Sequence, residues 1–334
     1  MPDSQAAQDL AQPEPATTLV AEHVQPDLGA AAPPAPAEPA AAAGTHGWDL
    51  PTAAPTVGTV RRQPVPSLAP ATRFRAPAVT LDAVQAGAVH VAAASVIGAS
   101  HTAAGGVRQD AYDFTTTGDG YLVIAVADGL GSRPLSQLGA AFFCTGVTQA
   151  AIGQGSSAPR AAEELLCRGA EYAAAAQDFC QVPPAESAFV AAVAVLPPAR
   201  TGGIRTADVA RVGDVSAFAI DPHGLLAELF TSHDGPINIL GESLPGSAAS
   251  RPQRAHSQAR VLILATDGLA NDLRNSPGVR SWLSEQWTRP IGPFAFGDSL
   301  RYQRQGSHDD RTAIVVWQPA TGPGEAEEAS DECA

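Results

Sequence analysis

The chain has 334 residues, and 45% of them are hydrophobic, so it can bury a sizeable core and is not expected to be disordered throughout. Its formal net charge is −14 and all twenty basic residues are arginine, yet no segment is basic enough to bind nucleic acid. No apolar run is long enough to span a membrane, so we expect neither nucleic acid nor a membrane as a partner.

The cysteines indicate a reducing compartment. There are four of them, and none forms the CxxC spacing that is typical of a zinc site or a redox pair. The first residues, MPDSQAAQDL, lack the charged and apolar segments of a signal peptide. Both features favour a cytoplasmic protein.

Composition divides the chain into three parts. Residues 1–85 are rich in alanine and proline, as in GAAAPPAPAEPAAAAG, and hold too little bulky apolar surface to fold, so we expect a disordered tail. This tail could also serve as a docking arm for a partner. Residues 320–334 carry five acids and no base and are expected to form a second disordered tail. The folded domain is expected at residues 86–319.

Within that domain, the apolar runs predict strands and the runs with apolar residues three and four apart predict helices. Strands are expected at 90–98, 121–128, 188–196, 207–214, 216–224, 225–232, 260–267 and 311–318, with a hairpin turn at DPHG. Helices are expected at 134–152, 158–180 and 276–287, the last beginning at Ser276 and Pro277. Strands grouped apart from helices predict an α+β fold with antiparallel sheets covered by helices.

Several of these predicted strands meet an aspartate at one end. Asp128 and Asp267 each follow a buried apolar run and precede a glycine, in VADGLGS and ATDGL. Asp309 lies before the last strand, and we expect it near Asp267 if those two strands are antiparallel. Asp110 in GVRQDAYDF and Asp214 in RVGDVSAF complete the set. Aspartates buried together would repel one another unless a cation lies between them, and an all-oxygen site suits Mg²⁺ or Mn²⁺.

The ordered motifs GASH…RQDA, VADGLGS, RVGDVSAF, ATDGL and DDRTAIVV resemble the metal-dependent serine/threonine phosphatases of the type 2C (PPM) family over residues 90–318. They are similar to its bacterial branch. The resemblance implies a four-layer α/β/β/α sandwich, with two antiparallel sheets flanked by helices. It also implies two metal ions, and a weaker site for a third, in a cleft at one end of the sandwich.

The resemblance further implies a role for each residue. Asp128 would bridge the two ions and be central to catalysis, while the Gly129 carbonyl would bind the second ion. Asp267 and Asp309 would hold the first ion. The remaining two acids are Asp110, which would act through water, and Asp214, which would belong to a weaker third site.

The chain departs from the family pattern at the phosphate-binding position. Eukaryotic members have an arginine five residues before the opening aspartate, and this chain has Gly105 there. His101 and Arg108 are the candidates to hold the substrate phosphate instead, and His101 could also protonate the leaving group. Leu130 stands where some relatives have a histidine that serves as a general acid.

We therefore expect hydrolysis of phosphoserine and phosphothreonine in proteins by a water that two metal ions activate. The expected partners are a phosphoprotein substrate and a cognate serine/threonine kinase. The missing arginine and the altered third-metal motif leave an alternative: a pseudophosphatase that binds a phosphoprotein or a kinase without turnover.

Overall fold

The computed structural model describes residues 56–57, 76–153, 160–198, 203–230, 243–245 and 252–319. The acidic tail expected at 320–334 lies outside the described residues, as does most of the tail expected at 1–85. No described helix is long and apolar enough to cross a membrane.

One sheet has five strands, all antiparallel to their neighbours. Its strands, in spatial order, are β10 (Gln253–Ser257), β7 (Ala207–Val212), β6 (Phe189–Leu196), β5 (Leu122–Gly129) and β4 (Ala111–Thr116). Every residue of the central strand β6 is buried, because helices cover one face of the sheet and the second sheet covers the other.

The second sheet has six strands and is also antiparallel throughout. Its spatial order is β2 (Val79–Ala86), β3 (Val89–Val96), β13 (Arg311–Trp317), β11 (Val261–Ala265), β8 (Ser216–Ile220) and β9 (Leu226–Glu228). The predicted hairpin at DPHG is confirmed, since Asp221 and Leu225 close the turn between β8 and β9 through a backbone hydrogen bond of 3.0 Å. A short parallel pair, β1 (Thr56–Val57) with β12 (Gln303–Arg304), is separate from both sheets.

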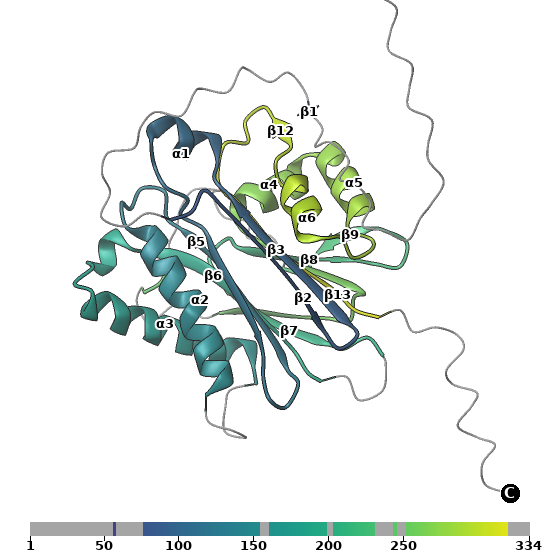
Figure 1. The fold of residues 1–334 in the computed structure, drawn as a ribbon, viewed down its shortest axis with the longest axis horizontal. Helices are drawn as coiled ribbons and strands as arrows, with labels where there is room; N and C mark the ends of the chain where they lie inside the picture. The colour runs from purple at the N-terminus through teal and green to yellow at the C-terminus, as the bar shows by residue number, and fades with distance from the viewer. Residues whose placement is uncertain are drawn as a thin grey trace, which may run out of the picture. The chain divides into compact units, whose positions relative to one another are not determined.

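Helices cover the outer face of each sheet, as Figure 1 shows. The helices α2 (Ser136–Ile152) and α3 (Ala162–Phe179) pack on the five-stranded sheet, and the turn η2 (Pro184–Glu186) follows them. The helices α4 (Asp267–Asn275), α5 (Pro277–Gln286) and α6 (Pro293–Ser299) pack on the six-stranded sheet. A short helix, α1 (Ala99–Ala104), follows β3. The predicted α/β/β/α sandwich is therefore the fold of the protein.

Three apolar layers hold the sandwich together. The layer between the sheets includes Val91, Ile124, Leu264 and Ile314, all of them almost fully buried. Full burial of such a side chain stabilises a fold by about 1.5–3 kcal/mol, so this layer fixes the two sheets against each other. The other two layers lie beneath the helices and contain most of the aromatic rings.

Most predicted elements are confirmed, with bounds that differ by a few residues. The start of α5 is one example, because the Ser276 hydroxyl accepts a hydrogen bond from the Val279 N–H and Pro277 is the first helical residue. A serine in this position stabilises a helix by about 1 kcal/mol.

Two expectations need correction. The domain boundary expected at residue 86 falls inside the second sheet, since Val79–Ala86 forms β2. This edge strand is mostly exposed, so its sequence, VTLDAVQA, lacks the continuous apolar run that marked the other strands. The strand expected at 260–267 ends at Ala265, and Asp267 instead begins α4.

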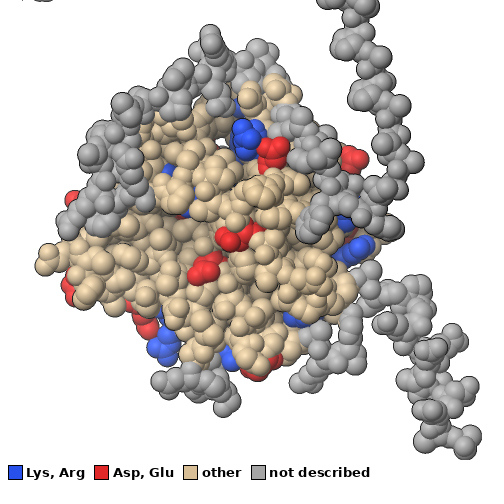
Figure 2. Space-filling view, in the orientation of Figure 1, with Lys and Arg blue, Asp and Glu red and all other residues tan. Residues whose placement is uncertain are grey.

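Arginines are scattered over the face that Figure 2 shows, and the described residues there form no continuous basic patch.

We expect a chain that starts at residue 87 to melt at least about 5 °C below a chain that starts at residue 76. Without β2, the backbone partners of β3 along eight residues are lost, and Arg108 loses its hydrogen bond to Thr80. Circular dichroism melts of both chains measure the difference. Both chains lack β1, so the comparison reports on β2 alone, and equal melting temperatures would contradict a structural role for this strand.

Candidate active site

A cavity of about 90 Å³ lies at one end of the sandwich, and its walls are mainly acidic. The structure brings together here five of the residues that the sequence analysis predicted as metal ligands: Asp128, Gly129, Asp214, Asp267 and Asp309. Leu130, Gly131 and Val190 complete the lining. These acids come from segments up to 181 residues apart (309 minus 128), so only the tertiary fold makes them neighbours.

Strand pairing explains why Asp128, Asp267 and Asp309 meet. Asp128 is the penultimate residue of β5, and Asp267 is the first residue of α4, just after β11. The strands β11 and β13 are antiparallel, and Ala265 lies opposite Ala313. The end of β11 therefore lies beside the start of β13, which confirms the expected approach of Asp309 to Asp267. The two sheets also meet here, because the Asp267 N–H donates to the Asp128 carboxylate at 3.4 Å.

Asp214 reaches the cavity from the turn that leads from β7 in one sheet to β8 in the other. The preceding residue, Gly213, has a φ of +83°, a conformation that L side chains rarely adopt. A Cβ atom at this position would also lie only 2.3 Å from Cγ1 of Val190. Glycine is therefore required for the turn that brings Asp214 to the cavity.

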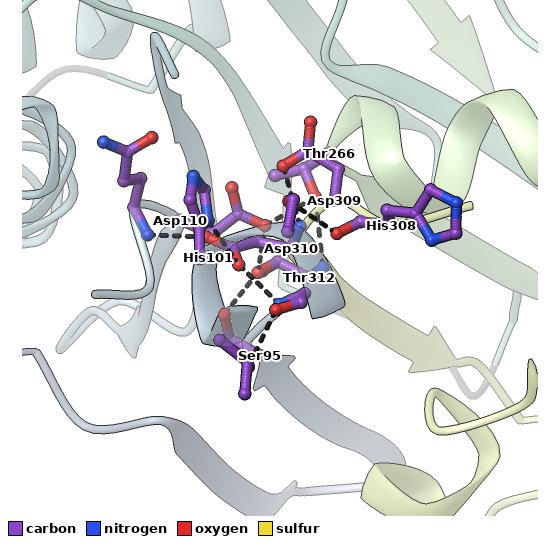
Figure 3. A network of polar contacts seen from close by, with 12 residues as sticks. Ser95, His101, Asp110, Thr266, His308, Asp309, Asp310 and Thr312 are labelled. Carbon is purple, nitrogen blue, oxygen red and sulfur yellow. Dashed lines mark hydrogen bonds and ion pairs between the residues drawn. The ribbon is translucent and has the colours of Figure 1, made fainter. Parts of the chain in front are cut away.

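Asp110 lies outside the cavity lining, buried just before β4. Its Oδ2 accepts hydrogen bonds from the hydroxyls of Thr266 at 2.8 Å and Thr312 at 2.7 Å, and Ser95 in turn bonds Thr312 (Figure 3). The sequence analysis missed these three hydroxyl residues. Two of them could have been found from their spacing, since Thr266 directly precedes Asp267 and Thr312 follows Asp309 by three positions.

Burial and mutual repulsion raise the pKa values of these acids. Burial raises the pKa of Asp110 to about 8, and the charge of Asp310 adds to the rise. Burial likewise raises the pKa of Asp267 to about 6, with Asp309 as its strongest repelling neighbour. The pKa of Asp128 rises well above its usual range, first through burial and then through the charges of Asp110 and Asp267. Each charge therefore makes its neighbours harder to ionise.

These residues fit a site for divalent cations. Within the part of the chain that the structure describes, none of the cavity carboxylates pairs with an arginine or a histidine. Carboxylate and carbonyl oxygens are the donors that Mg²⁺ and Mn²⁺ prefer. A bound cation would remove the repulsion that the fold imposes on the acids.

His101 lies at the edge of this acidic region and is held by Asp310. Its Nδ1 is 2.9 Å from Asp310 Oδ1, and this hydrogen bond raises the pKa of the imidazole. Asp310 also accepts from the backbone N–H groups of Gly98 at 2.7 Å and Gln109 at 2.6 Å. One donor atom each from His101, Asp309 and Asp310 lie within 4.8 Å of one another. Because Asp310 already accepts from three donors, its main role is to tie the loops together.

The structure does not bring Arg108 to the cavity. Its side chain is buried, and the guanidinium donates to the Thr80 hydroxyl at 2.6 Å on the neighbouring strand β2. The expectation that Arg108 could hold the substrate phosphate is therefore not supported. The imidazole of His308 points away from the polar network in Figure 3, although this residue directly precedes Asp309.

The presence of glycine at position 105 has a structural reason. Gly105 ends α1 with a φ of 66°, in the left-handed region, and its N–H caps the helix. An arginine here would be strained by its Cβ atom. The backbone conformation at this position therefore favours glycine over arginine.

In the metal-free protein, we expect Asp128→Asn to raise the melting temperature by about 2–5 °C, because it removes one of the repelling charges. Added MnCl₂ should then stabilise the parent protein more than the variant, since binding to the folded state raises its stability. Differential scanning fluorimetry measures both effects. The control is Glu164→Gln, at an exposed position of α3, which also removes one negative charge. It should change neither the melting temperature nor the stabilisation by Mn²⁺. Equal stabilisation of parent and Asp128→Asn by Mn²⁺ would exclude Asp128 as a ligand.

A model of the protein phosphatase 2C family matches residues 97–293, more than half of the 334-residue chain. The matched region contains Asp110, Asp128, Asp214 and Asp267 and ends before Asp309. No curated protein matches the chain.

Several solved bacterial structures are similar at low sequence identity. RsbX in complex with magnesium is 18% identical, with a TM-score of 0.48, and the match covers 72% of this chain and 100% of RsbX. The serine/threonine phosphatase of S. agalactiae is 15% identical, with a TM-score of 0.49 and coverage of 72% and 99%. Stp1 from Staphylococcus aureus is 11% identical, with a TM-score of 0.45 and coverage of 78% and 99%. On the extent of the family match, the chain belongs to the protein phosphatase 2C family.

Proposed function

We propose that the protein hydrolyses phosphoserine and phosphothreonine in other proteins, with two Mn²⁺ or Mg²⁺ ions in the acidic cavity. One observation carries the proposal: Asp128, Gly129, Asp267 and Asp309 line a single cavity without a basic partner among the described residues. When bound, the ions would lower the pKa of a water for attack on phosphorus and neutralise charge on the phosphate.

The protein's own groups have separate tasks in this proposal. Asp128 would hold both ions, because it is the penultimate residue of β5 and its carboxylate accepts from the N–H of Asp267 at the start of α4. Asp267 and Asp309 would also hold the first ion, and the Gly129 carbonyl would hold the second. Asp110 acts indirectly, through water, because it lies outside the cavity lining. Asp214 belongs to a weaker third site.

We assign binding of the phosphate and protonation of the leaving group to His101. Its side chain is 18% exposed, and Asp310 holds it through Nδ1, so the other ring nitrogen remains for the substrate. The raised pKa of His101 favours the protonated form, which is both a cation and a proton donor. Leu130 lines the cavity and cannot donate a proton.

The proposed partners follow from this activity. They are a phosphoprotein substrate and the serine/threonine kinase that phosphorylates it, in the cytoplasm.

A pseudophosphatase is the second candidate, and it too has an observation in its favour. Among the residues that the structure describes, no arginine lines the acidic cavity: position 105 is a glycine, and Arg108 is bonded to β2. In this alternative, the protein would bind a phosphoprotein or a kinase without hydrolysing phosphate.

We expect the full chain to release phosphate from a phosphothreonine peptide in MnCl₂ and to lose this activity in EDTA. Asp128→Ala should lower kcat by at least about 1000-fold, because it removes the group that both ions are proposed to share. Malachite-green detection of phosphate measures the rates. Activity that EDTA does not inhibit, or that Asp128→Ala retains, would contradict the proposal. Tight binding of the peptide without turnover would favour the pseudophosphatase.

His101→Ala should lower kcat/KM for the same peptide by about 10- to 100-fold, the effect of losing a hydrogen bond to a charged group. The matched control is His308→Ala, because the His308 ring points away from the network (Figure 3). Steady-state kinetics across pH 5.5–8.5 should also show that the rate of the parent protein falls at high pH, as the His101 imidazole loses its proton. This fall should be absent in His101→Ala. Equal effects of the two substitutions would rule out a role for His101 in the reaction.

A further inference from the structure

A second, larger cleft adjoins the acidic cavity. It has a volume of about 540 Å³, within the range of ligand sites, and Gly131 lines both spaces. Its walls come from α1 and the segment that follows it, from the segment between β5 and α2 together with the start of α2, and from the residues after α3. A ligand bound in the acidic cavity would therefore lie next to the larger cleft.

The two spaces differ in chemistry. Four carboxylates line the acidic cavity, whereas no described aspartate, glutamate or arginine lines the larger cleft. Its apolar wall residues are Val107, Pro134, Leu135 and Val182, of which Val107 and Leu135 are partly exposed. His101 also lines it, so the residue proposed to hold the phosphate stands at the border. A ligand with a charged phosphate and an adjacent apolar group would match both spaces.

Gln109 provides a buried acceptor in this cleft. The residue is only 7% exposed, and its Nε2 donates to the Arg133 carbonyl at 3.1 Å. The opposite orientation of the amide would set two acceptors against each other, so the carboxamide orientation is defined. Its Oε1 is buried and has no hydrogen-bond partner among the described residues. An unsatisfied buried acceptor costs about 1–3 kcal/mol, so a ligand N–H at this point would be favourable.

The end of α3 shapes the far wall of the cleft. Gln181 has a φ of 55°, and the Val182 N–H bonds back to the Gln177 carbonyl at 2.8 Å. This left-handed turn ends the helix and directs Val182 into the protein, where it is buried. Phe179, the last residue of α3, is 88% exposed.

We propose that this cleft binds the polypeptide that flanks the phosphorylated residue of the substrate. An apolar side chain near the phosphoserine or phosphothreonine enters between Val107 and Leu135, and Gln109 Oε1 accepts a hydrogen bond from a main-chain N–H. The inference rests on the proposed function and adds a substrate class: phosphoproteins with an apolar residue within two positions of the phosphorylated one.

The test is a binding measurement, which needs no turnover. Two fluorescent peptides contain a non-hydrolysable phosphonate analogue of phosphothreonine, flanked on both sides either by leucines or by serines. Fluorescence anisotropy in MnCl₂ measures Kd for the full chain and for Leu135→Ser, Gln109→Leu and Phe294→Ser. The last is the matched control, because Phe294 is 79% exposed on α6, over the other sheet. Val107→Ser replaces Leu135→Ser if that variant does not fold.

We expect the full chain to bind the leucine peptide at least about 5-fold more tightly than the serine peptide, because apolar surface is buried. Leu135→Ser should remove this preference. Gln109→Leu should raise the Kd of both peptides by a similar factor, about 5-fold, because a main-chain hydrogen bond does not depend on the flanking side chains. Phe294→Ser should retain the parent values.

Equal Kd values of the full chain for the two peptides, a preference that survives Leu135→Ser, or no binding of either peptide would overturn the inference. Failure of the proposed function gives a different result. In that case, the proteins would show no Mn²⁺-dependent hydrolysis of p-nitrophenyl phosphate, while anisotropy would still report the preference for leucine.

Discussion

Repulsion among buried carboxylates is the constraint on which the rest of this site depends. Asp128, Asp267 and Asp110 are held where burial and each other's charges oppose their ionisation. An isolated loop would relieve this repulsion by moving apart. Here the acids follow or precede buried strands of two packed sheets, so they cannot separate without disrupting the apolar layer between the sheets. The fold thus holds the acids at close range, as a cation site requires.

The same packing determines how each acid is supported. Asp110 is bonded by two threonine hydroxyls, and Asp310 accepts from two backbone N–H groups and from His101. These contacts join the start of β4, the start of β13 and the loop that contains α1. Asp110 and Asp310 are therefore each held by groups from several elements, and a change at Asp310 would disturb both His101 and the neighbouring Asp309.

The chain has Gly105 five residues before Asp110, and its backbone there favours glycine over arginine. Gly105 adopts a left-handed conformation to end α1, and Arg108 is used to anchor the edge strand β2. The groups that remain between the acidic cavity and the larger cleft are His101 and Gln109, both lining that cleft. Recognition of the substrate would then depend on an imidazole, a carboxamide and apolar contacts.

The sequence by itself determined the α+β class, most of the strands and the set of acids, because each signal is local: an apolar run, a helical period or an aspartate before a glycine. It did not reveal the edge strand β2, whose exposed side chains carry no apolar pattern, or the helix that starts at Asp267. Only the tertiary structure decided that Arg108 faces β2, that Thr266 and Thr312 bond Asp110, and that Gln109 has a free acceptor beside an apolar cleft. These contacts join residues from different strands and loops, and their geometry depends on how the two sheets pack, which no local pattern records.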